Sequence, residues 1–168
     1  MNKTHIDPEE LRRVFTYKDG ELYWAIDAKK TAPAGSLAGT LCKTGGRQVK
    51  LHRTLLYVHR VIFAMFHGYY PEMVDHINGN RDDNRVENLR AATRSQNGMN
   101  RHHKSRSSGC VGVYWHKRIS KWQASIRKNS VDKHLGYFPS FLDAVAARRA
   151  AENRLFGDFA PRRNTEKE

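Results

Sequence analysis

The sequence predicts an α+β protein made of two modules, and three patterns lead to that prediction. Residues 58–67 (VHRVIFAMFH) are apolar on almost every side, which indicates a buried helix. Residues 111–138 contain three short runs in which apolar and polar residues alternate, as in strands. The run FLDAVAARRAAENRLFG then has the spacing of an amphipathic helix. A length of 168 residues suffices for two small domains.

Cap and turn residues place the elements of the first half. Asp7 and Pro8 are typical of a helix start, and Gly68 is typical of the end of the buried helix. Gly45 and Gly46 indicate the turn of a hairpin. In chain order we expect a helix, a strand, a hairpin and the buried helix, at residues 8–15, 22–24, 39–52 and 58–67.

The polar stretch VDHINGNRDDNRVENLRAATRSQN follows at residues 74–97. We expect a strand at 73–76, a turn at 78–80, one helical turn capped by Asp83 and a second strand at 88–92. Thr93 and Gln96 fit a capping box, so a helix should begin at Thr93 and carry Asn97 about one turn in.

The charge balance predicts an anionic partner. Lys and Arg number 30 against 17 Asp and Glu, which gives a formal net charge of +13. Between Glu87 and Asp132 there is no acidic residue, although that stretch holds ten Lys or Arg. Double-stranded DNA is the partner that we expect. A basic protein without a nucleic-acid role is the alternative.

Several other classes are excluded at this level. The two cysteines, Cys42 and Cys110, are too few for a disulfide framework or a cysteine zinc site, which favours a reducing, intracellular and cytoplasmic location. No apolar run reaches the ~18 residues of a membrane span, and the N-terminus lacks the apolar centre of a signal peptide. No protein partner is predicted.

Four residues of the polar stretch suit phosphodiester hydrolysis, which needs a base, a cation and fixed geometry. Imidazole has a pKa of about 6.5, so His76 can act as the base. Asp75 and the amide oxygen of Asn97 are hard ligands suited to one Mg²⁺ or Mn²⁺. Asn88 can orient His76. Neighbouring strand residues point to opposite faces, so Asp75 and His76 share a site only if the strand ends or bends there. A purely structural Asn-rich loop is the alternative.

This stretch resembles the HNH nuclease motif of the ββα-metal superfamily, and more closely the HNH homing endonucleases of phages and introns. The Asp-His pair, the loop from Gly79 to Asn84 and the phrase Asn88-Leu89-Arg90 carry the resemblance, over residues 50 to 100. It implies a metal on Asp75 and Asn97, His76 as general base, and Asn88 as its support. The earlier His59-Arg60 also matches, and we assign His59 structural support, with an ordinary packed histidine as the alternative. Since the cysteine quartet of some relatives is absent, no structural zinc is expected.

The C-terminal sheet has one face predicted to pack on the helix and one predicted to read DNA. Val113, Trp115, Trp122, Ala124 and Ile126, with Leu135 and Phe138, should face the helix. A sheet with a polar, basic outer face can enter the major groove. A small α+β domain with a solvated face is the alternative. Residues 109–159 resemble the APETALA/ethylene-response-factor DNA-binding domain, which implies a three-stranded antiparallel sheet packed on one helix. Tyr114 and His116 stand where arginines are usual in that family.

We therefore predict an HNH-type DNA endonuclease with its own recognition sheet. The expected regions are an N-terminal part with the HNH core (1–100, core about 50–100), a basic linker (101–109), an APETALA/ERF-like domain (110–160) and a tail (161–168). The predicted DNA-binding residues are Arg90, Arg94, Arg101, Lys104, Arg106, Tyr114, His116, Arg118, Gln123, Ser125, Arg127 and His134. The alternatives are a non-cutting DNA-binding regulator with a decayed nuclease module, and a nuclease that acts on RNA.

Overall fold

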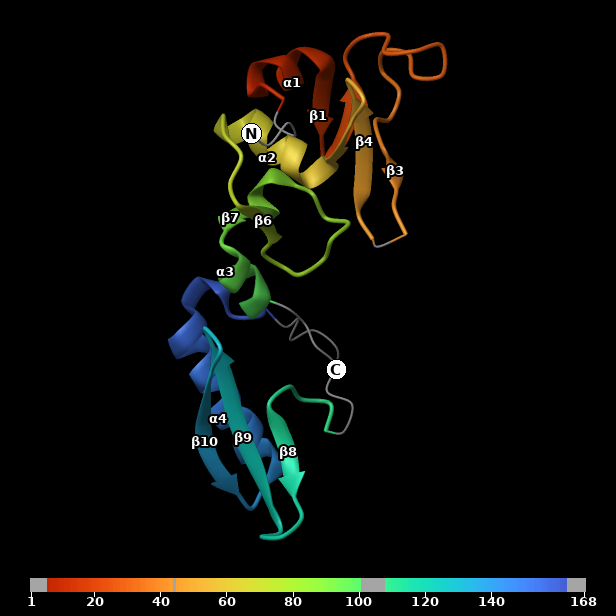
Figure 1. The fold of residues 1–168 in the computed structure, drawn as a ribbon. Coiled ribbons are helices and arrows are strands. Elements are labelled where there is room, and N and C mark those ends of the chain that lie inside the picture. The colour runs from red at the N-terminus through yellow and green to blue at the C-terminus, as the bar shows by residue number, and fades with distance from the viewer. Residues whose placement is uncertain (1–5, 44, 101–107, 163–168) are drawn as a thin grey trace. The chain divides into compact units, whose positions relative to one another are not determined.

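The computed structural model describes residues 6–43, 45–100 and 108–162 (Figure 1). The chain divides into two compact units, Met1–Thr93 and Arg94–Glu168. The first unit combines helices with small antiparallel sheets, and the second combines helices with a single antiparallel sheet. The predicted α+β class is therefore confirmed. No helix within the described ranges is both long and apolar enough to cross a membrane.

The first unit contains three small antiparallel sheets and two helices. The sheets pair β1 with β2, β3 with β4 and β5, and β6 with β7. In chain order its elements are α1 (Pro8–Val14), β1 (Phe15–Lys18), β2 (Glu21–Trp24), β3 (Thr40–Leu41), β4 (Arg47–Leu51), β5 (Thr54–Tyr57), α2 (Val58–His67), β6 (Met73–His76), the 3₁₀ turn η1 (Val86–Asn88) and β7 (Leu89–Ala92).

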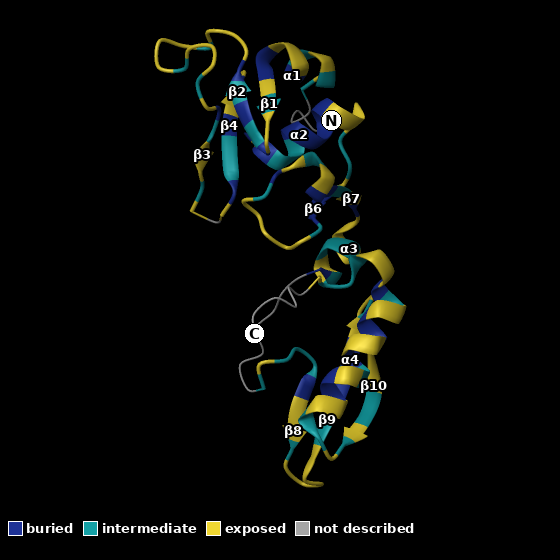
Figure 2. Ribbon diagram, turned by 180° about the vertical axis from the view of Figure 1, so that it is seen from behind, coloured by how far each residue is buried: buried dark blue, intermediate teal, exposed yellow. Residues whose placement is uncertain are grey.

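Helix α2 is the centre of this unit, as the sequence predicts. Six of its ten residues are buried, and Figure 2 shows it as a largely buried ribbon. It contacts α1 and at least one strand of each of the three sheets. Gly68 ends the helix in the left-handed conformation, with φ of 76°. The helix therefore fixes the three sheets relative to one another.

Two-residue turns with positive φ form the tight hairpins of this unit. Asp19 and Gly20 have φ of 49° and 87°, and His52 and Arg53 have φ of 45° and 64°. Such turns match the twist of the strands that they join. The sequence prediction missed β1 and β5, because each contributes only four residues and directly adjoins a helix.

The second unit is a three-stranded antiparallel sheet packed on one long helix. The strand order is β10-β9-β8. Its elements are α3 (Arg94–Met99), β8 (Val113–His116), β9 (Lys121–Lys128), β10 (Val131–Phe138), α4 (Phe141–Phe156) and the 3₁₀ turn η2 (Gly157–Phe159). Ser140 caps α4 by accepting a hydrogen bond from the Leu142 amide at 3.1 Å. These strands and this helix lie where the sequence predicts them.

A buried ion pair lies under this sheet. Arg148 Nε donates to Glu152 Oε1 at 3.0 Å, and both side chains are more than nine-tenths buried. Arg148 also donates to the Ser125 carbonyl of β9, which joins α4 to the central strand. The loop before β8 passes so close that a side chain at Gly112 would overlap the Arg148 guanidinium and the Ser125 carbonyl oxygen.

Two local predictions are corrected. The helical turn capped by Asp83 is wrong: the 3₁₀ turn begins at Val86 and has no side-chain cap, because Asp83 is bound to Arg85 instead. Trp115 makes a ring contact with Trp122 at 5.4 Å but is 45% exposed, so it does not lie under the helix as predicted.

Candidate functional site

The site begins with two buried polar residues at the end of β6. Asp75 is 5% exposed and His76 is 8% exposed. Asp75 pairs across the sheet with Arg90, whereas the ring of His76 lies 5.1 Å from the ring of His59 on α2. The two side chains thus point to different faces of the strand pair, as strand geometry requires. The Gly79 amide donates to the His76 carbonyl at 2.8 Å, so the chain turns immediately after His76.

The ring of His76 is held by Asn84. His76 Nε2 lies 2.9 Å from Asn84 Oδ1, and Asn84 is only 4% exposed. Because an amide oxygen can only accept, Nε2 is the donor in this contact, which leaves Nδ1 as the unprotonated nitrogen whenever the ring is neutral. The bond therefore selects the tautomer in which Nδ1 can take a proton. Sequence analysis assigned no role to Asn84, although it lies in the loop that carries the HNH resemblance.

His59 packs against His76 from α2. Burial is the main reason why the pKa of His59 is lowered to about 3, and the neighbouring His76 lowers it further. His59 is therefore neutral throughout the neutral pH range. Its ring also lies 5.5 Å from that of Tyr57, so three rings lie in sequence from β5 to His76. This placement agrees with a supporting role for His59, which stays a prediction.

Asn88 organises the loop after β6. Its Nδ2 donates to Asn78 Oδ1 at 3.0 Å and to the Asp83 carbonyl at 2.7 Å. Its Oδ1 accepts from the Asn78 amide at 3.0 Å. Both N–H groups of the Asn88 amide are thus used within the loop, and its backbone carbonyl accepts from the Ile77 amide at 2.8 Å. Asn88 thus shapes this loop, whereas Asn84 is bonded to the imidazole, and a supporting role of Asn88 for the base stays a prediction.

The first hairpin supports the same loop. The Val86 amide donates to the Tyr17 hydroxyl at 3.2 Å. A side chain at Gly20 would lie 3.0 Å from the Arg85 nitrogen and 3.2 Å from the Asn84 carbonyl carbon. Only glycine therefore allows the β1–β2 turn to approach so closely. The position of Asn84 depends on residues about 65 positions earlier in the chain.

Asp83 and Arg85 close the loop on its exposed side. Arg85 donates from Nε and Nη2 to the two Asp83 carboxylate oxygens, each at 2.8 Å. This hydrogen bonding is the main reason why the pKa of Asp83 is lowered to about 2. The loop is therefore held by a bidentate ion pair, which favours one geometry more strongly than a single contact does.

Asp75 is held by Arg90. Arg90 donates from Nε and Nη2 to Asp75 Oδ2 at 2.9 and 2.7 Å, and both side chains are largely buried. Sequence analysis assigned Arg90 to DNA phosphates, and the structure places it on this carboxylate. A carboxylate and amide oxygens are donors that suit Mg²⁺ or Mn²⁺. Among the described residues no three His, Cys, Asp or Glu side chains form a metal-binding group. A cation would therefore need amide, water or phosphate oxygens beside Asp75.

The other predicted residues lie in the second unit or outside the described ranges. Asn97 and Arg94 belong to α3, which packs within the second unit through Met99. The convergence of Asn97 with Asp75 stays a prediction. The linker residues Arg101, Lys104 and Arg106 lie outside the described part of the chain.

The outer face of the C-terminal sheet carries the predicted DNA-reading side chains. Tyr114 pairs with Gln123 across the sheet, and Gln123 pairs with Tyr137. The Tyr137 ring lies 5.5 Å from that of His116 and 4.7 Å from that of His134. Tyr137 thus belongs to this face, although sequence analysis did not select it because the bulge at residues 134–136 shifts the alternation.

Charged residues border this face. Arg127 forms an ion pair with Asp132, and Arg118 is exposed in the β8–β9 turn. Ser125 lies between Gln123 and Arg127 on the central strand. The face therefore combines aromatic rings, amide and hydroxyl groups and Arg127, and Arg118 lies in the turn that joins β8 and β9.

Comparison with known proteins finds a family match for residues 56–99. A family model described as HNH endonuclease matches residues 56–99, which include α2, β6, β7 and α3. An uncharacterized HNH endonuclease of Acanthamoeba polyphaga mimivirus is 34% identical over 110 residues, which are 62% of this chain and 56% of that protein. Protein 3.8 of Escherichia phage T7 is 32% identical over 94 residues, which are 55% of this chain and 74% of that protein. Residues 56–99 thus form an HNH endonuclease domain.

The match over residues 56–99 confirms the resemblance to the HNH motif drawn for residues 50–100, and the homing type stays a prediction. The chain spans little more than half of the mimivirus protein and about three quarters of the phage protein. No solved structure matches the chain. The likeness of residues 109–159 to the APETALA/ERF domain stays a prediction.

Proposed function

We propose that this protein is a divalent-metal-dependent, site-specific DNA endonuclease of the homing type. The observation that carries the proposal is the buried His76 at the end of β6, with Nε2 fixed by Asn84 within the HNH-matched region. An imidazole that is positioned through one ring nitrogen suits the role of general base. In the same region Asp75 supplies a buried carboxylate.

In the proposed reaction, His76 Nδ1 takes a proton from a water molecule. The resulting hydroxide attacks the phosphorus of the scissile phosphodiester, the bond to the 3′ oxygen breaks, and this leaving oxygen takes a proton from solvent water. The products are a 5′-phosphate and a 3′-hydroxyl. Asn84 accepts a hydrogen bond from Nε2 and keeps the ring in place, and the neutral ring of His59 packs against the imidazole.

Asp75 and Asn97 are the proposed holders of a divalent cation, Mg²⁺ or Mn²⁺, which would neutralise charge on the phosphate and on the leaving oxygen. Arg90 fixes the orientation of the Asp75 carboxylate through two hydrogen bonds. The ion pair therefore holds the Asp75 carboxylate in one orientation.

The C-terminal sheet is the proposed reader of the target. Its outer face offers donors, acceptors and aromatic rings of the kind that contact base edges in the major groove. The named candidates on this face are Tyr114, His116, Arg118, Gln123, Ser125, Arg127 and His134, and phosphate contacts are proposed for Arg94, Arg101, Lys104 and Arg106.

Incubation with supercoiled DNA tests this function. We expect nicked or linear DNA with Mg²⁺ and none with a chelator. His76→Ala should lose a factor of about 10² to 10⁴ in cleavage rate and should bind DNA as the parent chain does. Intact binding without cleavage by the unmodified chain would favour a regulator with a decayed nuclease module. Equal loss of binding and cleavage in His76→Ala would contradict its role as base.

A further inference from the structure

The sheet β3–β4–β5 of the first unit presents a face that the proposed site does not use. Residues paired directly across strands point to the same side, so Lys50 and Leu55 share the outer face, as do Gln48 and Tyr57. Leu55 is 58% exposed and Tyr57 is 41% exposed. The opposite face carries Val49, Leu51 and Leu56, which belong to the core. The outer face is therefore an exposed strip with apolar and basic groups.

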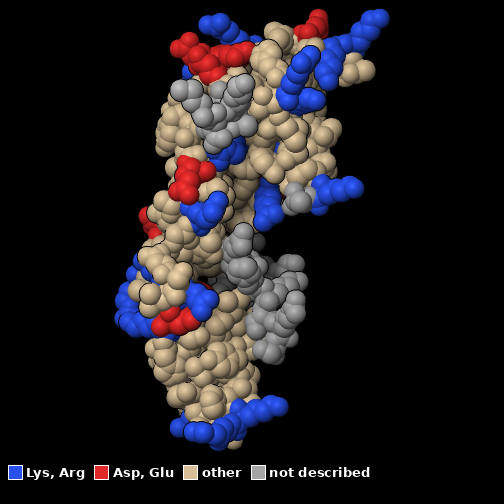
Figure 3. Space-filling model, in the orientation of Figure 1, with Lys and Arg blue, Asp and Glu red and all other residues tan. Residues whose placement is uncertain are grey.

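The charge of this region is strongly one-sided. Residues 28–71 contain no Asp or Glu and hold seven Lys or Arg. Arg47 is neutralised by Glu21 at 3.6 Å, whereas no carboxylate in the described ranges forms an ion pair with Lys43 or Lys50. Around the tip of the β3–β4 hairpin, Figure 3 shows Lys and Arg and no Asp or Glu. A polyanion is the partner that such a surface fits.

The strip leads to the candidate base. At the Tyr57 end, the rings of Tyr57, His59 and His76 follow one another at 5.5 and 5.1 Å. The hairpin tip approaches the loop after β6, where Cβ atoms added at Gly45 and Gly46 would lie 3.9 Å from Arg81 atoms. All these residues belong to the first unit. The surface and the base are thus fixed relative to each other within one core.

We propose that the outer face of β4–β5, with the hairpin tip, is a second DNA-binding surface that holds the duplex beside the scissile bond. Lys43 and Lys50 contact phosphates, and Leu55 and Tyr57 pack against deoxyribose. Tyr57 is a positioning residue, because it lies next to the ring that packs on His76. This inference rests on the proposed function for its substrate, and it assigns a role to residues that precede the HNH-matched region.

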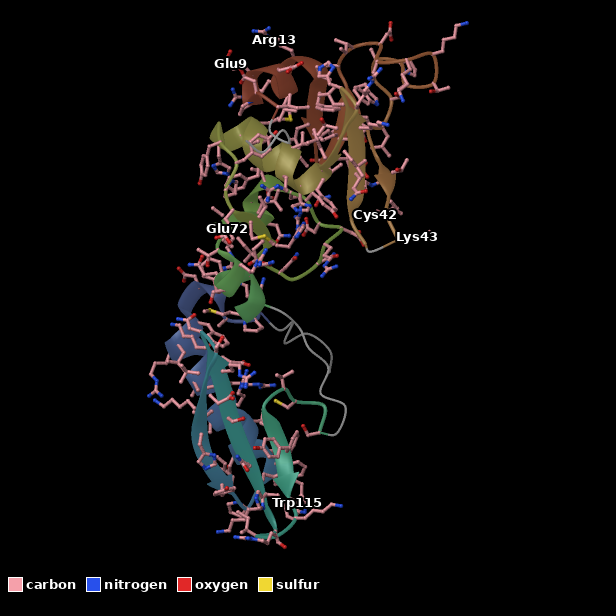
Figure 4. The ribbon with its side chains drawn as sticks, viewed as in Figure 1. Glu9, Arg13, Cys42, Lys43, Glu72 and Trp115 are labelled. Carbon is pink, nitrogen blue, oxygen red and sulfur yellow. The ribbon has the colours of Figure 1, made fainter. Side chains whose placement is uncertain are left out.

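The phosphate contacts are tested by binding in the His76→Ala chain, which separates binding from cleavage. Log affinity for a short duplex of mixed sequence is measured against log salt concentration. Lys43→Gln and Lys50→Gln should each make the slope shallower by about 0.9, the value for one phosphate contact. Arg13→Gln removes one charge from α1, which Figure 4 shows away from Lys43, and should leave the slope unchanged. Unchanged slopes in both lysine variants would overturn the proposal.

The role of Tyr57 is tested by cleavage at saturating DNA. Tyr57→Ala should lower the rate roughly tenfold, since a misplaced strand slows the reaction even when all of the protein holds DNA. Tyr57→Phe keeps the ring and should restore the rate. Tyr69→Ala is the matched control, because Tyr69 is also exposed, at 51%. If the unmodified chain never cleaves DNA but the lysine variants still give a shallower slope, the DNA-binding surface is supported and the nuclease function is rejected. Full cleavage by Tyr57→Ala would remove Tyr57 from the proposal.

Discussion

Replacement of Asn84 by alanine isolates one hydrogen bond of the candidate site. The bond to His76 Nε2 measures 2.9 Å, and both residues are more than nine-tenths buried. A hydrogen bond worth about 1–2 kcal/mol favours the orientation in which Asn84 holds the His76 ring by about 5- to 30-fold, since 1.4 kcal/mol corresponds to a factor of ten. We therefore expect the cleavage rate at saturating DNA to fall about 5- to 30-fold in Asn84→Ala. That loss is smaller than in His76→Ala, because the base itself remains.

The assay compares single-turnover cleavage of supercoiled DNA with duplex affinity and with thermal unfolding. Affinity should stay unchanged, whereas the unfolding free energy should fall by about 1–3 kcal/mol because a buried ring N–H loses its acceptor. Asn80→Ala is the matched control, since Asn80 lies in the same loop but is exposed. A cleavage rate unchanged in Asn84→Ala, or lowered equally in Asn80→Ala, would refute the assignment of Asn84 as the residue that holds the base.

Three further predictions concern stability. The pKa of His59 is about 3 in the folded chain, below the ordinary 6.5 of the unfolded chain, so stability should fall with decreasing pH between 6.5 and 3, by up to about 1.4 kcal/mol per pH unit; urea unfolding of His59→Gln should show a flatter profile there. Glu152→Leu should destabilise the second unit by about 3–5 kcal/mol, because Arg148 stays buried without its carboxylate; a loss below 1 kcal/mol in calorimetry would contradict this. Gly112→Ala should unfold at lower temperature than Gly109→Ala, since both have φ near 74° but only Gly112 lies against Arg148.

The elements that sequence analysis located best have strong local signals. The helix at Val58–His67 is apolar all round and ends at a glycine, and the strand at Met73–His76 lies directly before a turn sequence. Strands β1 and β5 lack such signals, because four residues beside a helix give no clear alternation. Local pattern is thus sufficient where one segment determines its own structure.

The site was predicted only in part, for a different physical reason. Asp75 and His76 are recognisable from their chemistry, whereas the choice between Asn84 and Asn88 as the partner of the imidazole depends on how the loop folds. Similarly, nothing local in the sequence pairs Arg90 with Asp75 rather than with phosphate, because that contact arises from strand register. Contacts across the sheet depend on strand register, which the local sequence pattern does not determine.

The support that Tyr17 and Gly20 give to the loop at Asn84 has a consequence for truncation. A fragment that starts at residue 56, where the family match begins, would keep every residue named in the chemistry. It would lack the hydroxyl that receives the Val86 amide and the turn that packs against Asn84 and Arg85. The smallest fragment that folds with an intact site is therefore expected to include the β1–β2 hairpin. Its first residue would lie some forty residues before the start of the family match.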